Sequence, residues 1–505
     1  MVPSIGRDKG RWTDSAQGWP AFTPGFAARA VVAVAILFCV AFVVLTQLHE
    51  LHLYADGGMM SYAVAVQDSW RFLWRNMSGR LLVYVVAYAP ASALIDMTGN
   101  PAHGVRLYAF LFSVAPALGL AMTWLLDRTP DRLVFLYACL STVLLCPLVF
   151  GFPTEMWFTH AMVWPVLALS LNPPRRWYGR IGMAAAVLAL LETHEAAVGL
   201  GLIAAVVAIA FGCSAAPDGR LVRARLAWPP FVVAFAVWLA IKIKLPPDEI
   251  MAETLARNAR RLLDLWDVID TPITLQLAVG LGAFIALCAL ARALRLRRGF
   301  VLAAGAVLLG LLVYWVGFDT ALHAEQRYHI RLIFAAGMAA LTVFAALHAQ
   351  LHRRGPGWEV IARLRGALLP PALRLQAMRF GAFAAVLLTL ISSYEVVKFC
   401  RAWDRYADAV RQLVLAGGPP PEGQPPPAVS TEFIPADLQR LAWHSTAPFL
   451  SVLLVPGYRA PRYAVDPEAA YFPLTCALSL SNVERALAFP AETRLMLHAY
   501  NCRFG

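Results

Sequence analysis

Apolar and polar segments alternate along the first four fifths of the chain. Most apolar segments hold roughly 17 to 22 residues, close to the length of about 20 that a helix needs to cross a bilayer. Lipid offers the backbone no hydrogen-bonding partner, so we expect these segments to be helices. The pattern predicts about 11 membrane spans, near residues 27–47, 105–126, 132–150, 156–171, 181–191, 195–212, 227–245, 273–292, 299–317, 330–349 and 380–399.

Arginines in the loops between these segments predict the orientation. Four loops, marked by Arg175, Arg220, Arg295 and Arg353, hold several arginines and at most one acidic residue. Cytoplasmic loops of membrane proteins carry such an excess of basic residues. We therefore expect the N-terminal segment, residues 1–26, and these four loops in the cytoplasm, and the C-terminus outside.

The apolar stretch 81–95 is the difficult case. If it crossed the membrane, five crossings would precede Arg175, and that basic loop would lie outside. The stretch is short and contains Pro90, so we predict a re-entrant or interfacial helix covered by protein. It then belongs to a long first external loop, residues 47–104, inside a transmembrane domain of residues 27–400.

Composition agrees with lipid as the solvent. Of 505 residues, 59% are hydrophobic and 15% are charged, whereas a soluble domain carries about 25% charged residues. The net charge of +12 does not indicate nucleic acid as a partner, because the arginines lie in short loops between apolar runs. We expect a multi-pass protein of the bacterial inner membrane, in contact with membrane lipid.

The chain changes character after the last span. Residues 401–429 contain two runs of three prolines and are predicted to form a stiff linker. Residues 430–505 mix short helical patterns with β-type alternation over 449–455, which favours a small extracytoplasmic α+β domain. Since that compartment is oxidising, Cys476 and Cys502 are a candidate disulfide.

Ionisable side chains at the membrane are costly to bury, so each is a candidate functional residue. Asp56 lies shortly after the first span and precedes two glycines, which allow the backbone to approach a ligand closely. Residues 61–74 are predicted to form an amphipathic interfacial helix. Asp56 could act as a general base toward an acceptor hydroxyl or simply cap a turn.

Two further acidic turns are predicted on the outer side. Glu155 precedes a span, with His160 one turn further along. This acid could bind an acceptor or help place a phosphate through a metal, and stabilisation of the helix start is the alternative for Glu155. Glu192, His194 and Glu195 lie where two short helices meet, and we expect them to face a cavity rather than lipid.

A basic motif is predicted at the entry of the tenth span. Arg327 and Arg331 are four residues apart and would share a helix face, with His329 between them. Two guanidinium groups suit the phosphate of a lipid-linked donor. Contact with lipid headgroups and an ion pair with Glu325 are the alternatives.

This layout resembles the GT-C superfamily of integral-membrane glycosyltransferases. The resemblance covers roughly residues 27–400 and consists of one span, a long external loop with Asp56 and interfacial helices, a span beginning near Arg106, and the acidic turn at Glu155. An external domain at the C-terminus also looks like that superfamily. The sequence departs from it because Asp56 is followed by Gly-Gly and because the second turn has a single acid.

The resemblance implies an enzyme that takes a sugar from a polyprenyl-phosphate-linked donor and transfers it to a glycan, lipid or protein acceptor outside the membrane. Asp56 would be the base, and Arg327 and Arg331 would hold the donor phosphate. The two departures favour an enzyme without a metal or other cofactor. Other possibilities from the sequence are a polytopic transporter or flippase and a polysaccharide polymerase or ligase.

Overall fold

A computed structural model describes residues 25–65, 67, 80–150, 154–214, 220–244, 324–351 and 371–416, with short stretches between 286 and 310 and between 428 and 465. Most of these residues are helical. Up to residue 150 the elements are α1 (Phe26–Leu48), η1 (Leu51–Leu53), α2 (Asp56–Ala65), α4 (Leu81–Val83), η2 (Tyr84–Tyr88), α5 (Ala89–Thr98), α6 (Pro101–Leu126), η3 (Pro130–Arg132), α7 (Leu133–Leu145) and η4 (Cys146–Val149).

The later elements are also mainly helices. They are α8 (Met156–Leu171), α9 (Trp177–Leu191), α10 (Ala196–Ser214), α11 (Arg220–Lys244), α16 (Ala324–Leu351), α18 (Pro371–Leu415), η6 (Thr431–Phe433), α19 (Ala436–Gln439), α20 (Ala447–Leu453) and η7 (Pro456–Tyr458). Two short strands, β1 (Ala428–Val429) and β2 (Ala464–Val465), pair in parallel.

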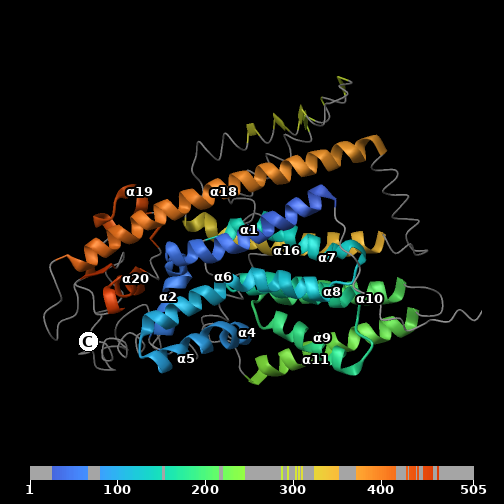
Figure 1. Ribbon diagram of the computed structural model, residues 1–505, viewed down its shortest axis with the longest axis horizontal. Coiled ribbons are helices and arrows are strands. Elements are labelled where there is room, and N and C mark those ends of the chain that lie inside the picture. Colours follow the sequence, from blue (N-terminus) through green and yellow to red (C-terminus); the bar gives the residue numbers. More distant parts are fainter. Residues whose placement is uncertain are drawn as a thin grey trace, which may run out of the picture.

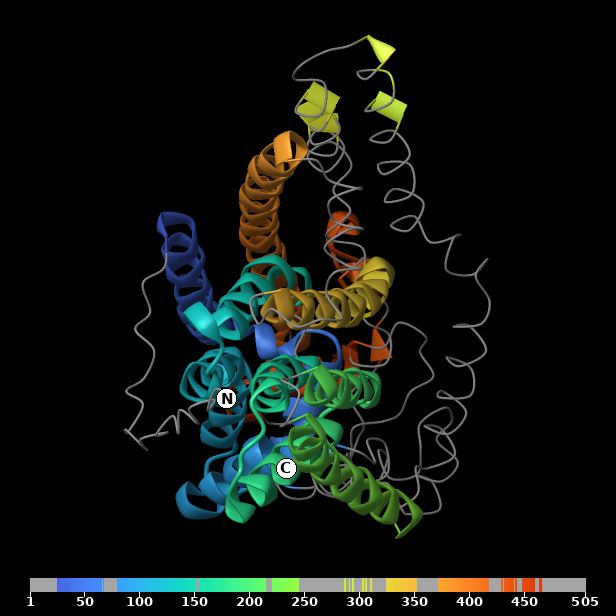
Figure 2. The same ribbon diagram turned by 90° about the vertical axis from the view of Figure 1, so that its right-hand side faces the viewer.

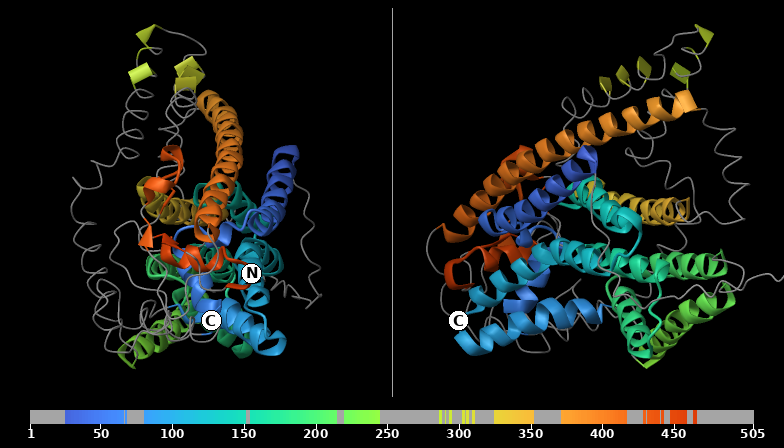
Figure 3. Two further views of the ribbon diagram at one scale, coloured as in Figure 1. Left: turned by 90° about the vertical axis from the view of Figure 1, so that its left-hand side faces the viewer. Right: turned by 45° about the vertical axis from the view of Figure 1, so that its right-hand side comes forward.

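The long helices lie roughly along the long axis of the molecule (Figure 1). Helices α6 and α8 pack against each other in the middle, and α1, α7 and α10 lie around them. Helix α18 runs along one side, as the turned views also show (Figures 2 and 3). Its last turns reach the end of the molecule where α2, α19 and α20 gather.

The described helices include segments suited to a membrane. Three are long and apolar enough to cross one, namely Phe26–Leu48, Leu81–Thr98 and Pro101–Leu126. Large apolar side chains also point outward on other helices; Val206 is 65% exposed and Ile243 72% exposed. An apolar outer surface is what a lipid-facing helix presents. The chain therefore has the helices of a membrane protein, while the count of about 11 spans and their orientation stay predictions.

The stretch predicted as re-entrant forms one continuous helical segment, Leu81–Thr98. A π-helical turn, Tyr84–Tyr88, ends two residues before Pro90. Because proline lacks an N–H and crowds the preceding turn, a widened turn at this place lets the helix continue. Gly99 then adopts φ 64°, and Asn100 accepts a hydrogen bond from Ala102 N at 3.0 Å to start α6. Whether this segment crosses or re-enters the membrane stays a prediction.

Helices α6 and α8 approach each other closely at one glycine. A Cβ atom added at Gly119 would lie 2.4 Å from Ala161 Cα. Only glycine permits this distance, as is common where membrane helices pack through small residues. The contact places the first turn of α8, and with it Glu155, beside the first half of α6.

Two local predictions in the first external loop and the tail are wrong. Instead of the start of an interfacial helix over 61–74, the described helix α2 begins at Asp56 and ends at Ala65, and nearly all of its residues are buried between α6 and α20. Residues 68–74 of that prediction lie outside the described residues. Residues 449–455 include most of helix α20 instead of a strand. Their apolar side chains, among them Phe449, Leu450 and Leu453, follow helical spacing and are buried together.

The predicted linker begins later than residue 401. Helix α18 continues through Leu415, because Trp403, Tyr406 and Val410 form a buried stripe at helical spacing. The proline runs themselves and residues 466–505, including Cys476 and Cys502, lie outside the described residues. The disulfide and the α+β domain therefore stay predictions.

Candidate functional site

The turn that carries Asp56 connects the end of α1 to α2. Its backbone is tight, since Glu50 and Ala55 both have left-handed φ values, 49° and 51°. Asp56 is the first residue of α2. A Cβ atom on Gly58 would lie 2.9 Å from Leu53 O, so this glycine of the Gly-Gly pair permits the backbone to fold back on itself.

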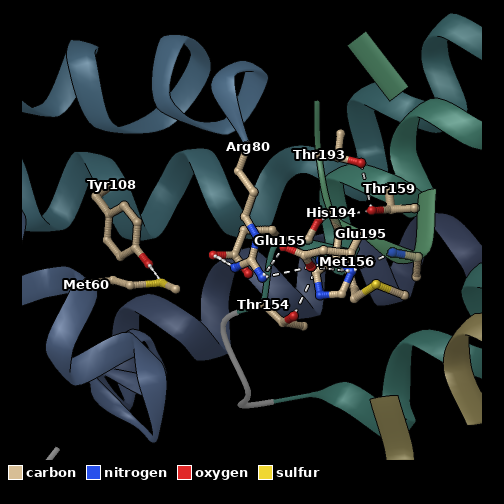
Figure 4. Close-up of polar contacts among 11 residues, drawn as sticks. Met60, Arg80, Tyr108, Thr154, Glu155, Met156, Thr159, Thr193, His194 and Glu195 are labelled. Carbon is tan, nitrogen blue, oxygen red and sulfur yellow. Dashed lines mark hydrogen bonds and ion pairs between the residues drawn. The ribbon is translucent and has the colours of Figure 1, made fainter. Parts of the chain in front are cut away.

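Helix α2, which begins at Asp56, packs against α6. The Tyr108 hydroxyl donates to Met60 Sδ at 3.4 Å, as Figure 4 shows. Helix α8, whose first turn follows Glu155, packs against the same helix α6. Asp56 and Glu155, the two acidic residues singled out from the sequence, therefore lie at the starts of two helices that both pack on α6.

Arg80 lies beside Glu155, in the acidic turn that precedes α8. Its Nη1 is 2.7 Å from Glu155 Oε1, and its Nη2 is 3.0 Å from Glu195 Oε2. The Arg80 side chain is 11% exposed and that of Glu155 is 3% exposed. His194 Nδ1 lies 3.3 Å from Glu195 Oε2. Figure 4 shows these side chains converging from the start of α4, the start of α8 and the turn between α9 and α10.

Charge compensation keeps Arg80 and Glu195 ionised. Burial lowers the pKa of the Arg80 guanidinium, but the charges of Glu155 and Glu195 outweigh this effect, so the pKa is raised above its ordinary value. Burial raises the pKa of Glu195, yet the charges of Arg80 and His194 lower it to about 2. At neutral pH the site therefore holds a charged guanidinium beside the ionised carboxylate of Glu195.

Glu192 extends the site to α11. Lys242 Nζ lies 3.0 Å from Glu192 Oε2. The Glu192 backbone carbonyl also accepts from Leu82 N at 3.2 Å. Free N–H groups at a helix start favour an acidic partner, so Glu192 fixes where the helix 81–98 begins. We use the name Arg80 cluster for Arg80, Glu155, Glu192, His194, Glu195 and Lys242.

His160 does not join the Arg80 cluster. Its Nε2 lies 3.0 Å from Ser141 Oγ on α7, and its ring lies 5.9 Å from that of Phe334 on α16. The pair predicted from the sequence, Glu155 and His160, thus divides between two environments. Thr193 is buried and pairs with Thr159, with 2.8 Å between the hydroxyl oxygens.

The predicted phosphate-binding residues fall in the first turns of α16. Arg327, His329 and Arg331 precede Phe334 on this helix, and their side chains lie outside the described part of the chain. Arg331 is three residues before Phe334, so its backbone is one turn from the contact with His160. Among the described residues, no group of three or more His, Cys, Asp or Glu has a geometry that suits a metal ion.

Sequence reasoning missed Arg80, Lys242 and Tyr108. Arg80 lies with Arg71 and Arg75 in the predicted first external loop, where basic residues run against the positive-inside trend, but nothing in the sequence singles it out from the other two. Lys242 also runs against that trend, because it lies near the predicted outer end of the span 227–245. Tyr108 offered no such signal, since a tyrosine within an apolar helix is ordinary.

The described residues define a helical protein of membrane type whose buried charges meet near one end of the helix 81–98. Its particular family is not shown: comparison of the sequence with family models, with curated proteins and with solved structures found no match.

Proposed function

We propose that the chain is a membrane glycosyltransferase of the GT-C type, which moves a sugar from a polyprenyl-phosphate donor to an acceptor at the outer face of the inner membrane. The observation that carries this proposal is that helix α2, which begins at Asp56, and helix α8, which follows Glu155, both pack against α6. Two acidic motifs from separate external turns then serve one site, as the resemblance implies.

Asp56 is the proposed general base. It takes the proton of the acceptor hydroxyl while the acceptor oxygen bonds to the sugar's anomeric carbon. The bond from that carbon to the donor phosphate breaks, and the polyprenyl phosphate leaves with the electron pair. Asp56 suits this role because it lies at the start of α2 and is less buried than its neighbours.

Arg80 is a poor candidate for the donor phosphate, because two carboxylates already surround it. The cluster instead holds Glu155 in place beside α6. The phosphate would be bound by Arg327, Arg331 and His329 on α16, a helix that packs against α8 and α10. No metal enters this proposal, since the basic residues supply the positive charge.

The test compares Asp56→Asn with Asp131→Asn, an exposed carboxylate at the opposite end of α6. Both variants are assayed for transfer from a panel of synthetic polyprenyl-phosphate sugars in proteoliposomes. We expect Asp56→Asn to lose at least about a hundredfold in rate, with normal expression and melting temperature, and Asp131→Asn to keep its activity. Near-normal transfer by Asp56→Asn would refute the assignment.

A transporter or flippase is the second candidate. The observation in its favour is the burial of the Arg80 cluster at the join of the short helices α9 and α10, since intramembrane charges often mark a transport path. Lipid movement across proteoliposomes without any sugar transfer would favour this class. Mass spectrometry that finds a copurifying polyprenyl phosphate together with transfer would favour the enzyme.

A further inference from the structure

The turn before Asp56 is strained. Glu50 and Ala55 lie on either side of η1, and both have left-handed backbone angles although neither is glycine. Such conformations cost free energy and persist where the surrounding structure enforces them. We call residues 49–56 the Asp56 turn. The backbone conformation of this turn therefore depends on contacts with the surrounding structure.

The contacts that hold the turn come from the far end of the sequence. Trp403 Nε1 on α18 donates to His49 O at 2.9 Å. One residue along, the Asp404 carboxylate lies 2.8 Å from His49 Nδ1. Arg411 Nη2, two turns further, lies 3.2 Å from Glu50 Oε2. Three polar contacts thus bind the two residues at the start of the turn to one face of α18.

Aromatic packing continues this attachment toward Asp56. The Tyr54 side chain is completely buried, and its ring lies edge-on to Phe399 at 5.0 Å and to Trp403 at 5.4 Å. The Tyr54 carbonyl accepts a hydrogen bond from Gly57 N at 3.0 Å. Trp403 therefore contacts the turn both at its start and two residues before Asp56.

Helix α20 completes the support from the other side. A Cβ atom on Gly58 would meet Leu450 Cδ2 at 3.3 Å, and the rings of Tyr62 and Phe449 lie 5.0 Å apart. Helix α2 is consequently packed between α6 and the C-terminal segment.

We propose that the outer part of α18, residues 399–411, is a clamp that positions Asp56, with Trp403 as its main positioning residue. The C-terminal segment is then part of the site and not an independent appendage. The consequence for catalysis rests on the proposed function, but the clamp itself requires no assumption about the reaction.

Two neighbouring aromatic residues on α18 provide a matched pair of variants. Trp403→Phe keeps an aromatic ring beside Tyr54 and removes the N–H donor to His49. Tyr406→Phe is the control, because Tyr406 is buried and stacks on Trp403 at 5.5 Å, while its hydroxyl makes no hydrogen bond in the described structure. Both variants are compared as full-length protein in detergent or nanodiscs.

Hydrogen–deuterium exchange tests the clamp directly. In Trp403→Phe we expect amides of the Asp56 turn and of α2 to exchange roughly threefold to tenfold faster, the effect of one lost hydrogen bond. Amides of α8 should be unchanged, and Tyr406→Phe should match the wild type. Unchanged exchange in Trp403→Phe, or equal acceleration in both variants, overturns the clamp.

Transfer from the synthetic donor panel gives the second readout. Trp403→Phe should lower kcat roughly tenfold while leaving KM for the donor unchanged, because a displaced base slows the chemical step. If the wild type transfers no sugar but the exchange result holds, the proposed function fails and the clamp stands. Should Trp403→Phe not fold, Asp404→Asn tests the same turn, and unchanged exchange there overturns the clamp.

Discussion

At the scale of single residues, the Arg80 cluster shows how buried charges are tolerated. Arg80 is held between Glu155 and Glu195, and Lys242 neutralises Glu192. Removing one member would leave an uncompensated buried charge, whose cost is about 3–5 kcal/mol. The cluster therefore joins the start of helix 81–98 to α8, to the turn before α10 and to α11.

Glu195 should make stability sensitive to acid. Its pKa is lowered from 4.5 to about 2 in the folded protein, so its contribution is complete above pH 4.5 and is lost as the pH falls toward 2. We expect Glu195→Gln to have a lower melting temperature than wild type at pH 7 and to flatten the fall in melting temperature below pH 4.5. Melting curves in detergent, with Asp131→Asn as control, measure both effects. A wild-type acid profile in Glu195→Gln contradicts this account.

The acidic half of the site could be predicted from the sequence, whereas its basic half could not. Asp56, Glu155, Glu192 and Glu195 stand out because carboxylates are rare beside apolar runs. Arg80 is one of three arginines in the predicted first external loop, and the sequence does not distinguish it from Arg71 and Arg75. Only the approach of distant helices identifies its partners, and hydrophobic periodicity carries no information about that approach.

At the scale of elements, apolar periodicity predicted most of the described helices within a few residues, but it failed for α2 and for the outer part of α18. Helix α2 is buried on nearly all sides, and its polar Ser61 donates a hydrogen bond to the His52 carbonyl inside the protein instead of facing the membrane surface. Helix α18 extends beyond the predicted span 380–399 because its outer turns bury aromatic residues against the Asp56 turn. In both cases tertiary contacts that are remote in sequence decide the local structure.

The contact between α6 and α8 yields a test at this scale. A Cβ atom at Gly119 would lie 2.7 Å from the Ala161 carbonyl oxygen, a backbone atom that cannot turn aside. We expect Gly119→Ala to destabilise the protein by about 1–3 kcal/mol, because the helices must separate. Thermal unfolding in detergent measures the change.

Gly182→Ala is the matched control for Gly119→Ala. This glycine also lies within a helix, α9, and a Cβ atom there meets nothing within 4 Å. Its substitution should be neutral or stabilising by up to about 1 kcal/mol, because alanine favours helix more than glycine does. Equal melting temperatures for the two variants would contradict the close packing of α6 on α8.

At the scale of the whole molecule, the proposed chemistry depends on sidedness. The Asp56 turn, α19 and α20 gather at one end of the helices (Figure 1), and the predicted orientation puts this end outside. The arginine-rich turn before α9 should face the cytoplasm. The two sides can be distinguished chemically.

Cysteine labelling tests the orientation. In a variant whose native cysteines are replaced, we introduce Asp437→Cys at a site whose side chain is 54% exposed, or Arg176→Cys, which is also exposed. An impermeant maleimide should label Asp437→Cys on intact spheroplasts and should label Arg176→Cys only after lysis. The reverse pattern would place Asp56 in the cytoplasm and exclude transfer at the outer face.

Helix α18 also has a mechanical consequence, because it is a single helix from Pro371 to Leu415. With a rise of 1.5 Å per residue, Arg411 lies roughly 30 Å beyond the middle of the predicted span. A change of about 5° in helix tilt would then displace Arg411 by roughly 3 Å. This displacement is comparable to the donor–acceptor distance of a hydrogen bond. Since membrane thickness influences tilt, α18 would make the position of the Asp56 turn depend on the lipid around the helix.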